Sequence, residues 1–373
     1  MTKSNWGNVY TKLGVRPVIN ASGNQTVWGG STPSPVVRQA MDEASASFVE
    51  MEELLKKSGD YIASILGVEA AYVTAGCYAA LVLSSAAVMT GNDPEKRAQL
   101  PDTTGLKNEI LLQKKQRYGY DRGYTVPGSK LLFVGDENGA TPEQLERAIG
   151  PNTAAVAYLV QSDQGNAIPL EQTVEIAHAH NVPVIADAAA QIHPLDYFLR
   201  NARSSDLVCF GGKYFNAPHS TGFVCGRKDL VEAVTAHGFI GPRPIGRGMK
   251  VDRQEIIGLV TALETWFSTD HEARALKYDA KFAVIARALA GVSAVRETKV
   301  VPNKSHTLAS LHIALDKKTL GKNAQQVAGE LDAGTPCIKV GTAGDDAVTI
   351  NVYTLNEGEE QIIADRLKSL LTG

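Results

Sequence analysis

Several features that direct other chains to metals, membranes or nucleic acids are scarce or missing in this sequence. It has four cysteines in 373 residues, and no two of them have metal-ligand spacing. We expect free thiols in a reducing compartment. The net charge of −3 provides no strong attraction for a phosphate backbone. No apolar run reaches membrane-spanning length, and the first ten residues, MTKSNWGNVY, lack an apolar signal core. We therefore expect a soluble cytoplasmic protein that binds no metal, nucleic acid or membrane.

The composition is that of an ordinary globular protein, with 44% apolar and 21% charged residues. Strand-like and helix-like segments alternate between residues 70 and 187, which is typical of a mostly parallel α/β sheet with helices on both faces. Residues 295–373 read as two strands, a helix, two strands and a helix. That pattern predicts a smaller C-terminal α+β domain.

We expect three parts along the chain. Residues 1–30 read as an irregular N-terminal arm with one short strand. Residues 31–250 form the predicted large domain, and residues 251–373 hold linking helices followed by the small domain. The segment GFIGPRPIGRGMK, at 238–250, is rich in glycine and proline and is the candidate hinge.

Two apolar strands end in groups that could react. VPVIAD ends at Asp187, and DLVCF runs into Gly-Gly-Lys with its amine on Lys213. Ligands bind at the carboxyl edge of an open α/β sheet, which is where both groups would lie. An acid and an amine together suit pyridoxal 5'-phosphate, which takes a lysine for its Schiff base and an acid against its pyridine nitrogen. The alternatives are a helix N-cap for Asp187 and a solvated surface charge for Lys213.

Other residues could complete such a site. The Ala75-Gly76-Cys77 turn leads from a strand into a helix, where free backbone N–H groups and the helix dipole favour a phosphate. Ser162, Asp163 and Gln164 end another strand, and one of them could bond the ring oxygen of the cofactor. The hydroxyls of Ser220 and Thr221 could reach the phosphate. The alternatives are a plain connector, a polar loop and a strand cap, respectively.

Two arginines are candidates for binding the substrate. Arg247 lies in the predicted hinge, and Arg117 lies in the basic segment LLQKKQRYGYDRGY, whose tyrosines Tyr118 and Tyr120 could line the mouth of the site. A guanidinium can clamp a carboxylate or a phosphate. The alternative for both arginines is a solvated loop.

Five segments occur together and in order, and they cover nearly the whole chain: VINASGNQTVWGGS, YVTAGCYAAL, IPLEQTVEIAHAHNVPVIADAAAQI, DLVCFGGKYFNAPHSTGFVCGRKDL and IGRGMKVDRQEIIGLVTALE. They resemble the fold-type-I pyridoxal-phosphate enzymes of the selenocysteine-synthase-like group. The resemblance implies the aminotransferase fold, with a mostly parallel sheet of the seven-stranded type, and a homodimer or larger assembly. It implies that Lys213 forms the Schiff base, that Asp187 pairs with the pyridinium and that Gln191, in Asp-Ala-Ala-Ala-Gln, binds the cofactor. Ala75-Gly76-Cys77 matches the phosphate loop.

The sequence departs from the group at four positions, the mildest of which is Gly248 in place of a proline in Gly-Arg-Gly-Met-Lys. Phe210 stands where the group commonly has a phosphate-binding serine before Gly-Gly-Lys. Gln116 stands where a histidine usually stacks on the cofactor ring, and we expect it to cover that ring instead. Cys337 replaces an arginine in the small domain, which removes an anion ligand.

The resemblance favours a lyase that acts on a small amino acid or an amino-sugar acid. Lys213 would remove the α-proton, and β-elimination would give a 2-oxo acid and ammonia. Racemisation, epimerisation and retro-aldol cleavage remain open alternatives. Selenium transfer on aminoacyl-tRNA is disfavoured, because it predicts an RNA-binding domain and a basic face. A non-catalytic protein is disfavoured because Lys213 and Asp187 are both present.

Overall fold

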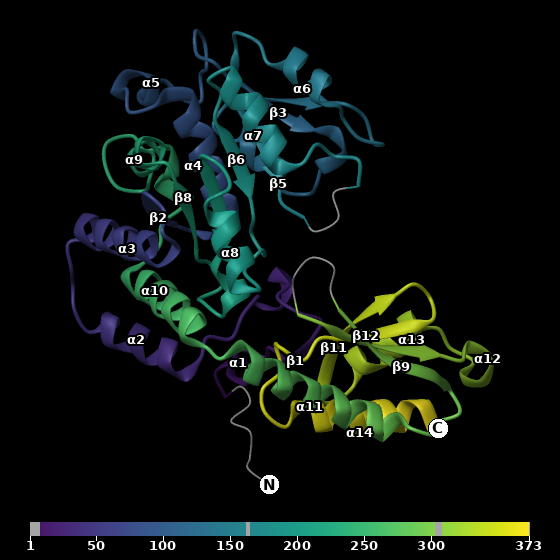
Figure 1. The fold of residues 1–373 in the computed structure, drawn as a ribbon. Coiled ribbons are helices and arrows are strands. Elements are labelled where there is room, and N and C mark those ends of the chain that lie inside the picture. The colour runs from purple at the N-terminus through teal and green to yellow at the C-terminus, as the bar shows by residue number, and fades with distance from the viewer. Residues whose placement is uncertain (1–7, 162–164, 303–307, 373) are drawn as a thin grey trace. The chain divides into compact units, whose positions relative to one another are not determined.

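The computed structural model describes residues 8–161, 165–302 and 308–372, which form two compact units (Figure 1). The large unit spans Ser31–Ser268. The small unit joins the residues up to Gly30 to those from Thr269 onward. The helix over Arg253–Ser268, which we expected among the linking helices, lies in the large unit.

The large unit is built on a seven-stranded sheet in the order β2-β8-β7-β6-β5-β3-β4. The strands are β2 Ala70–Thr74, β3 Glu109–Gln113, β4 Lys130–Val134, β5 Thr153–Leu159, β6 Val184–Asp187, β7 Leu207–Gly211 and β8 Gly222–Gly226. The pairings are parallel except for those of β8, which runs antiparallel to β2 and β7. The predicted fold class is confirmed. The central strands β5 to β8 are buried along their whole length, as expected of a sheet covered on both faces.

Helices surround this sheet. They are α2 Pro35–Ser45, α3 Met51–Leu66, α4 Gly76–Thr90, α5 Pro94–Gln99, α6 Pro142–Ala148, α7 Leu170–Ala179, α8 Leu195–Ala202, α9 Lys228–Ala236 and α10 Arg253–Ser268. Short 3-10 turns lie at η2 Lys114–Gln116, η3 Asp121–Thr125, η4 Gly212–Phe215 and η5 Ile245–Gly248.

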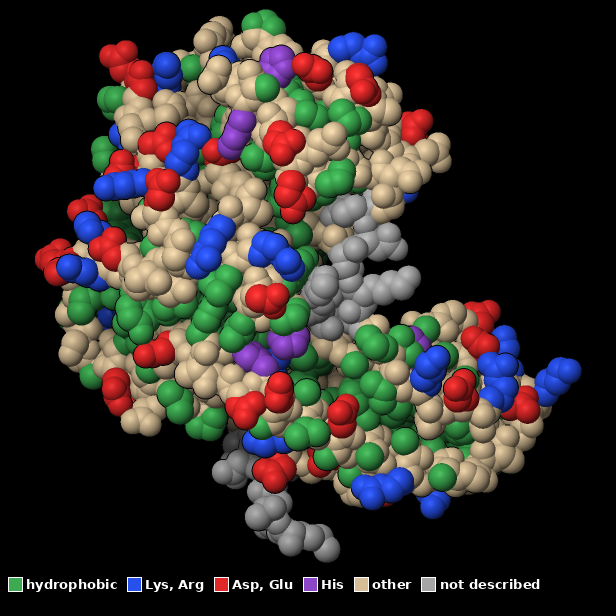
Figure 2. Space-filling model, viewed as in Figure 1, with side chains coloured by type: hydrophobic (Ala, Val, Ile, Leu, Met, Phe, Trp, Pro, Cys, Tyr) green, Lys and Arg blue, Asp and Glu red, His purple; other side chains and the backbone are tan. Residues whose placement is uncertain are grey.

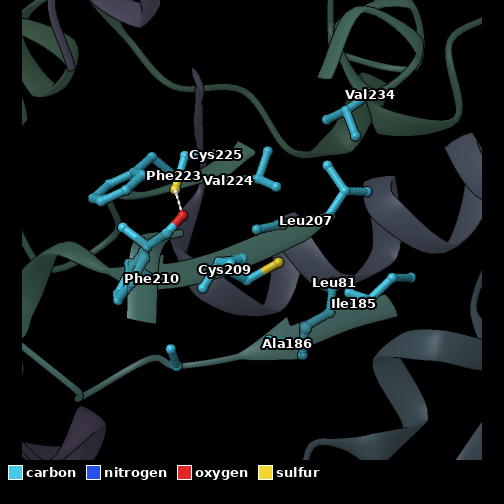
Figure 3. Packing of buried hydrophobic residues seen from close by; sticks show 14 of the residues in the cluster. Leu81, Ile185, Ala186, Leu207, Cys209, Phe210, Phe223, Val224, Cys225 and Val234 are labelled. Atoms are coloured by element: carbon cyan, nitrogen blue, oxygen red, sulfur yellow. Dashed lines mark hydrogen bonds between the residues drawn. The ribbon is translucent and has the colours of Figure 1, made fainter. Parts of the chain in front are cut away.

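Helix α4 lies against the middle of the sheet, and its small and apolar residues are almost all buried. Figure 3 shows Leu81 of this helix in one cluster with Ile185 of β6 and Leu207 of β7. Its polar side chains are satisfied inside the core, since the Ser85 hydroxyl donates to the Tyr124 carbonyl oxygen at 2.6 Å. This packing fixes the start of α4 at the carboxyl edge of the parallel strands.

The small unit contains a five-stranded sheet in the order β1-β11-β12-β10-β9. Its strands are β1 Val18–Ala21, β9 Val295–Val301, β10 Ser310–Leu315, β11 Cys337–Ala343 and β12 Ala347–Ile350. Its helices are α1 Asn8–Lys12, η1 Thr26–Trp28, α11 His271–Leu289, α12 Lys317–Leu320, α13 Ala324–Ala333 and α14 Glu359–Thr372. Strand β1 pairs in parallel with β11, so part of the expected N-terminal arm completes this sheet. Within the described ranges, no helix is long and apolar enough to cross a membrane.

Candidate active site

Asp187 and Lys213 lie at the same edge of the large sheet. Asp187 is the last residue of β6, and β6 pairs in parallel with β7, with Asp187 opposite Cys209. Lys213 follows β7 within η4. Two neighbouring parallel strands therefore deliver an acid and an amine to one place, as the sequence predicted.

The Asp187 carboxylate is buried and accepts three hydrogen bonds. The Cys77 thiol donates to Oδ1 at 3.4 Å, and the Ala189 N–H donates to Oδ1 at 3.0 Å. The Tyr118 hydroxyl donates to Oδ2 in a short contact. Burial raises the pKa of Asp187, and the donors from Tyr118, Ala189 and Cys77 work against that rise. The donors thus favour the ionised form of the acid.

Lys213 is half-buried on a turn that requires glycine before it. A Cβ on Gly212 would collide with Thr221 Oγ1 and lie 2.8 Å from Leu259 Cδ1. The Lys213 ammonium lies 5.1 Å from the centroid of the Tyr214 ring. Burial lowers the pKa of Lys213, and the nearby Cys77 has a smaller effect in the opposite direction. A lowered pKa leaves a larger fraction of the lysine amine unprotonated at neutral pH, where it can act as a base or a nucleophile.

The start of α4 has the features of an anion site. Gly76 adopts φ +82°, and a Cβ placed on it would meet no atom within 4 Å. Its N-cap residue, Ala75, gives the first helical N–H groups no side-chain acceptor. Strand β8 approaches the start of α4 closely at Gly222. A Cβ on Gly222 would lie 2.8 Å from the backbone nitrogen of Cys77, so this contact needs glycine. Free N–H groups at a helix start bind phosphates.

Pyridoxal 5'-phosphate fits these residues. A buried acid, a half-buried amine and an uncapped helix start are the three kinds of group that its pyridine nitrogen, aldehyde and phosphate require. Among the described residues, no group of three His, Cys, Asp or Glu side chains could hold a metal ion.

The structure places the remaining predicted cofactor residues as follows. Gln116 is buried, and its amide bonds both backbone groups of Leu159, at 3.3 and 3.4 Å. Gln191 is buried and accepts from the Tyr197 hydroxyl at 3.1 Å. Thr221 is buried, and its hydroxyl donates to a loop carbonyl at 2.7 Å. Ser162, Asp163 and Gln164 lie outside the described residues.

The two predicted substrate arginines have different surroundings. Arg117 forms an ion pair with the buried Asp121 at 3.1 Å, and its guanidinium lies 4.5 Å from the centroid of the Phe133 ring. This arginine has a structural role whatever else it does. Arg247 is exposed in η5.

Sequence reasoning missed two contacts at this site. It placed Tyr118 at the mouth without its bond to Asp187, and it treated Cys77 as part of a backbone loop without its thiol contact. It also gave no role to His219, whose Nδ1 is buried without a hydrogen-bond partner among the described residues. The signal available in the sequence was the position of His219, six residues after Lys213 in the same loop.

Comparisons with known proteins show which family this chain belongs to. The aminotransferase class-V family model matches residues 122–243. A D-glucosaminate-6-phosphate ammonia lyase from Salmonella typhimurium is 30% identical over 97% of this chain and 98% of its own. A 5'-C-glycyluridine monooxygenase-decarboxylase from a Streptomyces species is 31% identical over 88% of this chain and 83% of its own.

More distant relatives and a solved structure agree. An L-seryl-tRNA(Sec) selenium transferase from Moorella thermoacetica is 24% identical over 70% of this chain, which corresponds to 57% of that relative. A solved structure of D-glucosaminate-6-phosphate ammonia-lyase superposes with a TM-score of 0.87, at 30% identity and 98% coverage of both chains. The chain belongs to the fold-type-I, pyridoxal 5'-phosphate-dependent enzymes of the selenocysteine-synthase-like group, together with these ammonia-lyases.

Proposed function

We propose that this enzyme is an ammonia-lyase that acts on an amino-sugar acid. The observation that carries the proposal is the placing of Asp187 and Lys213 at one sheet edge, in a chain similar over its full length to a D-glucosaminate-6-phosphate ammonia lyase. The cofactor, when bound, supplies an electron sink for the α-carbon of an amino acid.

The residues of the chain have separate tasks. Asp187 would bind the pyridine nitrogen, and its Tyr118 and Ala189 donors favour the charge that this contact needs. Lys213 would hold the cofactor through its aldehyde group. The free amine of Lys213 would take the α-proton of the substrate. The start of α4 would bind the phosphate, with Thr221 beside the lysine loop.

The reaction balances without an oxidant. The α-proton goes to Lys213, and the electron pair of the Cα–H bond forms the Cα=Cβ double bond. The β-hydroxyl leaves with a proton as water. The resulting enamine takes up water again, so the products are a 2-oxo acid and ammonia.

The test is incubation with 2-amino-2-deoxy sugar acids and their 6-phosphates in the absence of oxygen. We expect ammonia and a 2-oxo acid in equal amounts from the wild type, and neither product from Lys213→Ala. Oxygen uptake with CO2 release, without anaerobic ammonia, would instead favour the chemistry named for the Streptomyces relative. Inversion at Cα or an aldehyde product would favour racemisation or retro-aldol cleavage.

Selenium transfer on aminoacyl-tRNA is the weaker candidate. The chain spans 57% of the selenium transferase that it resembles. On the face shown in Figure 2, basic and acidic side chains lie interspersed on the large unit and form no basic patch. We also propose that Arg247 binds an anionic group of the substrate, because it is an exposed cation in the glycine- and proline-rich loop before α10.

We further propose a homodimer or larger assembly in the cytoplasm. The large unit exposes big apolar side chains, including Phe48 at 94% and Tyr120 at 62%, together with Tyr78 in the first turn of α4 at 41%. Such side chains mark association surfaces when they gather. The four cysteines are unpaired, which fits a reducing compartment. A monomer mass by light scattering, in a sample that shows full activity, would contradict the assembly.

A further inference from the structure

His219 carries a buried ring nitrogen that the rest of the site does not use. It lies on residues 216–221, the connection from η4 to β8. Its Nδ1 is buried and has no hydrogen-bond partner among the described residues. Most buried polar atoms are bonded, so an unpaired one beside a reactive group calls for a functional explanation.

The loop that carries His219 folds back onto the lysine turn. The Ala217 N–H donates to the Gly212 carbonyl at 3.1 Å, and the Gly212 N–H donates to the Thr221 carbonyl at 2.8 Å. Burial lowers the pKa of His219, and the positive charge of Lys213 lowers it further. The two hydrogen bonds hold this loop, and with it His219, against the turn that carries Lys213.

Other titratable groups at this edge are already engaged. The Cys77 thiol and the Tyr118 hydroxyl both donate to Asp187, on the side of the site that holds the pyridine nitrogen. Burial comes first among the causes that raise the pKa of both donors. They are therefore poor sources of a proton for a leaving group.

Two charged groups in the first turn of α10, which packs against η4, are also engaged. Glu255 accepts from the Ser220 hydroxyl in a short contact. Arg253 donates to the carbonyl oxygens of Ala44 and Ser45, at 3.1 and 2.9 Å.

We propose that His219 carries the proton from Lys213 to the group that leaves the β-carbon. The inference rests on the proposed ammonia-lyase reaction, in which hydroxide is a poor leaving group and needs a proton. Lys213 Nζ takes the α-proton and passes it to the His219 ring. The ring gives a proton to the β-hydroxyl oxygen as the Cβ–O bond breaks, so water leaves and both side chains return to their starting state.

The substitutions His219→Gln and His219→Ala test this, with His180→Gln as the matched control on an exposed histidine of the large unit. Two steps are measured separately: exchange of the α-proton in D2O by NMR, and release of ammonia. We expect the His219 variants to keep α-proton exchange within about twofold and to lose ammonia release by about 10²–10⁴-fold. Added imidazole should restore part of the release in His219→Ala. Equal loss of both steps, or loss of neither, would overturn the assignment.

A second measurement uses the cofactor-free protein and needs no turnover. The pKa of His219 is followed by NMR in the wild type and in Lys213→Ala. Removing the positive charge should raise the pKa of His219, and an unchanged pKa would overturn the inference. If the wild type showed neither exchange nor ammonia release, the proposed reaction would fail, but this titration would still decide whether His219 lies beside Lys213.

Discussion

Tyr118→Phe removes the hydroxyl that donates to Asp187 and leaves the ring in place. Asp187 is 4% exposed, so water cannot easily replace the lost donor. A hydrogen bond to a charged group contributes about 1.5–3 kcal/mol, whereas one between neutral groups contributes about 1 kcal/mol. Because the three donors favour the ionised form of Asp187, the cofactor-free variant should lose about 1.5–3 kcal/mol of unfolding free energy at neutral pH.

The loss should depend on pH in a defined direction. The pKa of Asp187 is raised in the folded protein from the ordinary value of 3.8, so the folded state binds the proton more tightly than the unfolded state does. Stability from this group is therefore greatest at low pH and falls as the pH rises through the raised value. Without the Tyr118 donor, the pKa of Asp187 rises further, so the difference between variant and wild type should shrink to about 1 kcal/mol in acid.

Urea unfolding of the cofactor-free protein at a series of pH values measures this effect. Tyr120→Phe is the matched control, because its ring packs edge-on to Tyr118 at 6.1 Å but its side chain is 62% exposed. If Tyr118→Phe behaved like Tyr120→Phe at neutral pH, the hydroxyl would not support the acid. A difference that did not change with pH would refute the assignment of the effect to the charge of Asp187.

Three further predictions concern the large unit. Gly76→Ala should lower the free energy of unfolding by about 1–2 kcal/mol and should also weaken the binding of phosphate and cofactor. Gly105→Ala, at a similar φ of +77°, is the control. It should lose stability in unfolding assays but bind cofactor normally in reconstitution assays. His237 is buried, and burial lowers its pKa to about 4. The stability that its neutral ring provides should therefore be fully present above pH 6.5. Between pH 6.5 and 4 the free energy of unfolding should fall by up to about 1.4 kcal/mol per pH unit. His237→Gln should flatten that fall in acid unfolding curves, and an unaltered curve would show that another group is responsible. Asp206→Asn should cost about 2 kcal/mol, because this buried carboxylate bonds His178, Val184 N–H and Arg227, yet calorimetry should find cofactor affinity unchanged.

The sequence predicted the sheet edge well, because hydrophobic runs define buried strands and the residue at each carboxyl end then has a known place. Asp187 follows directly from the strand VPVIAD, and Lys213 from the strand before Gly-Gly. The start of α4 followed from the strand-to-helix turn at Ala75. These predictions depend only on the order of the strands and helices along the chain. They do not depend on how the loops run between them.

Loop paths could not be predicted. Tyr118, which bonds Asp187, lies between two 3-10 turns, η2 and η3. Turns this short have no hydrophobic periodicity in the sequence that would predict them. The same turns bring Gln116 onto the backbone of Leu159, a contact that a comparison of residue types with the family does not reveal. The four residues of β1 are too few to show from their pattern which sheet they would join.

The most direct test of the account is to reduce the cofactor-loaded protein with borohydride, digest it and locate the modified lysine by mass spectrometry. The account predicts one pyridoxyl group on Lys213, lost in Lys213→Ala. Modification of another lysine, or reduction that left no pyridoxyl group on the chain, would contradict it.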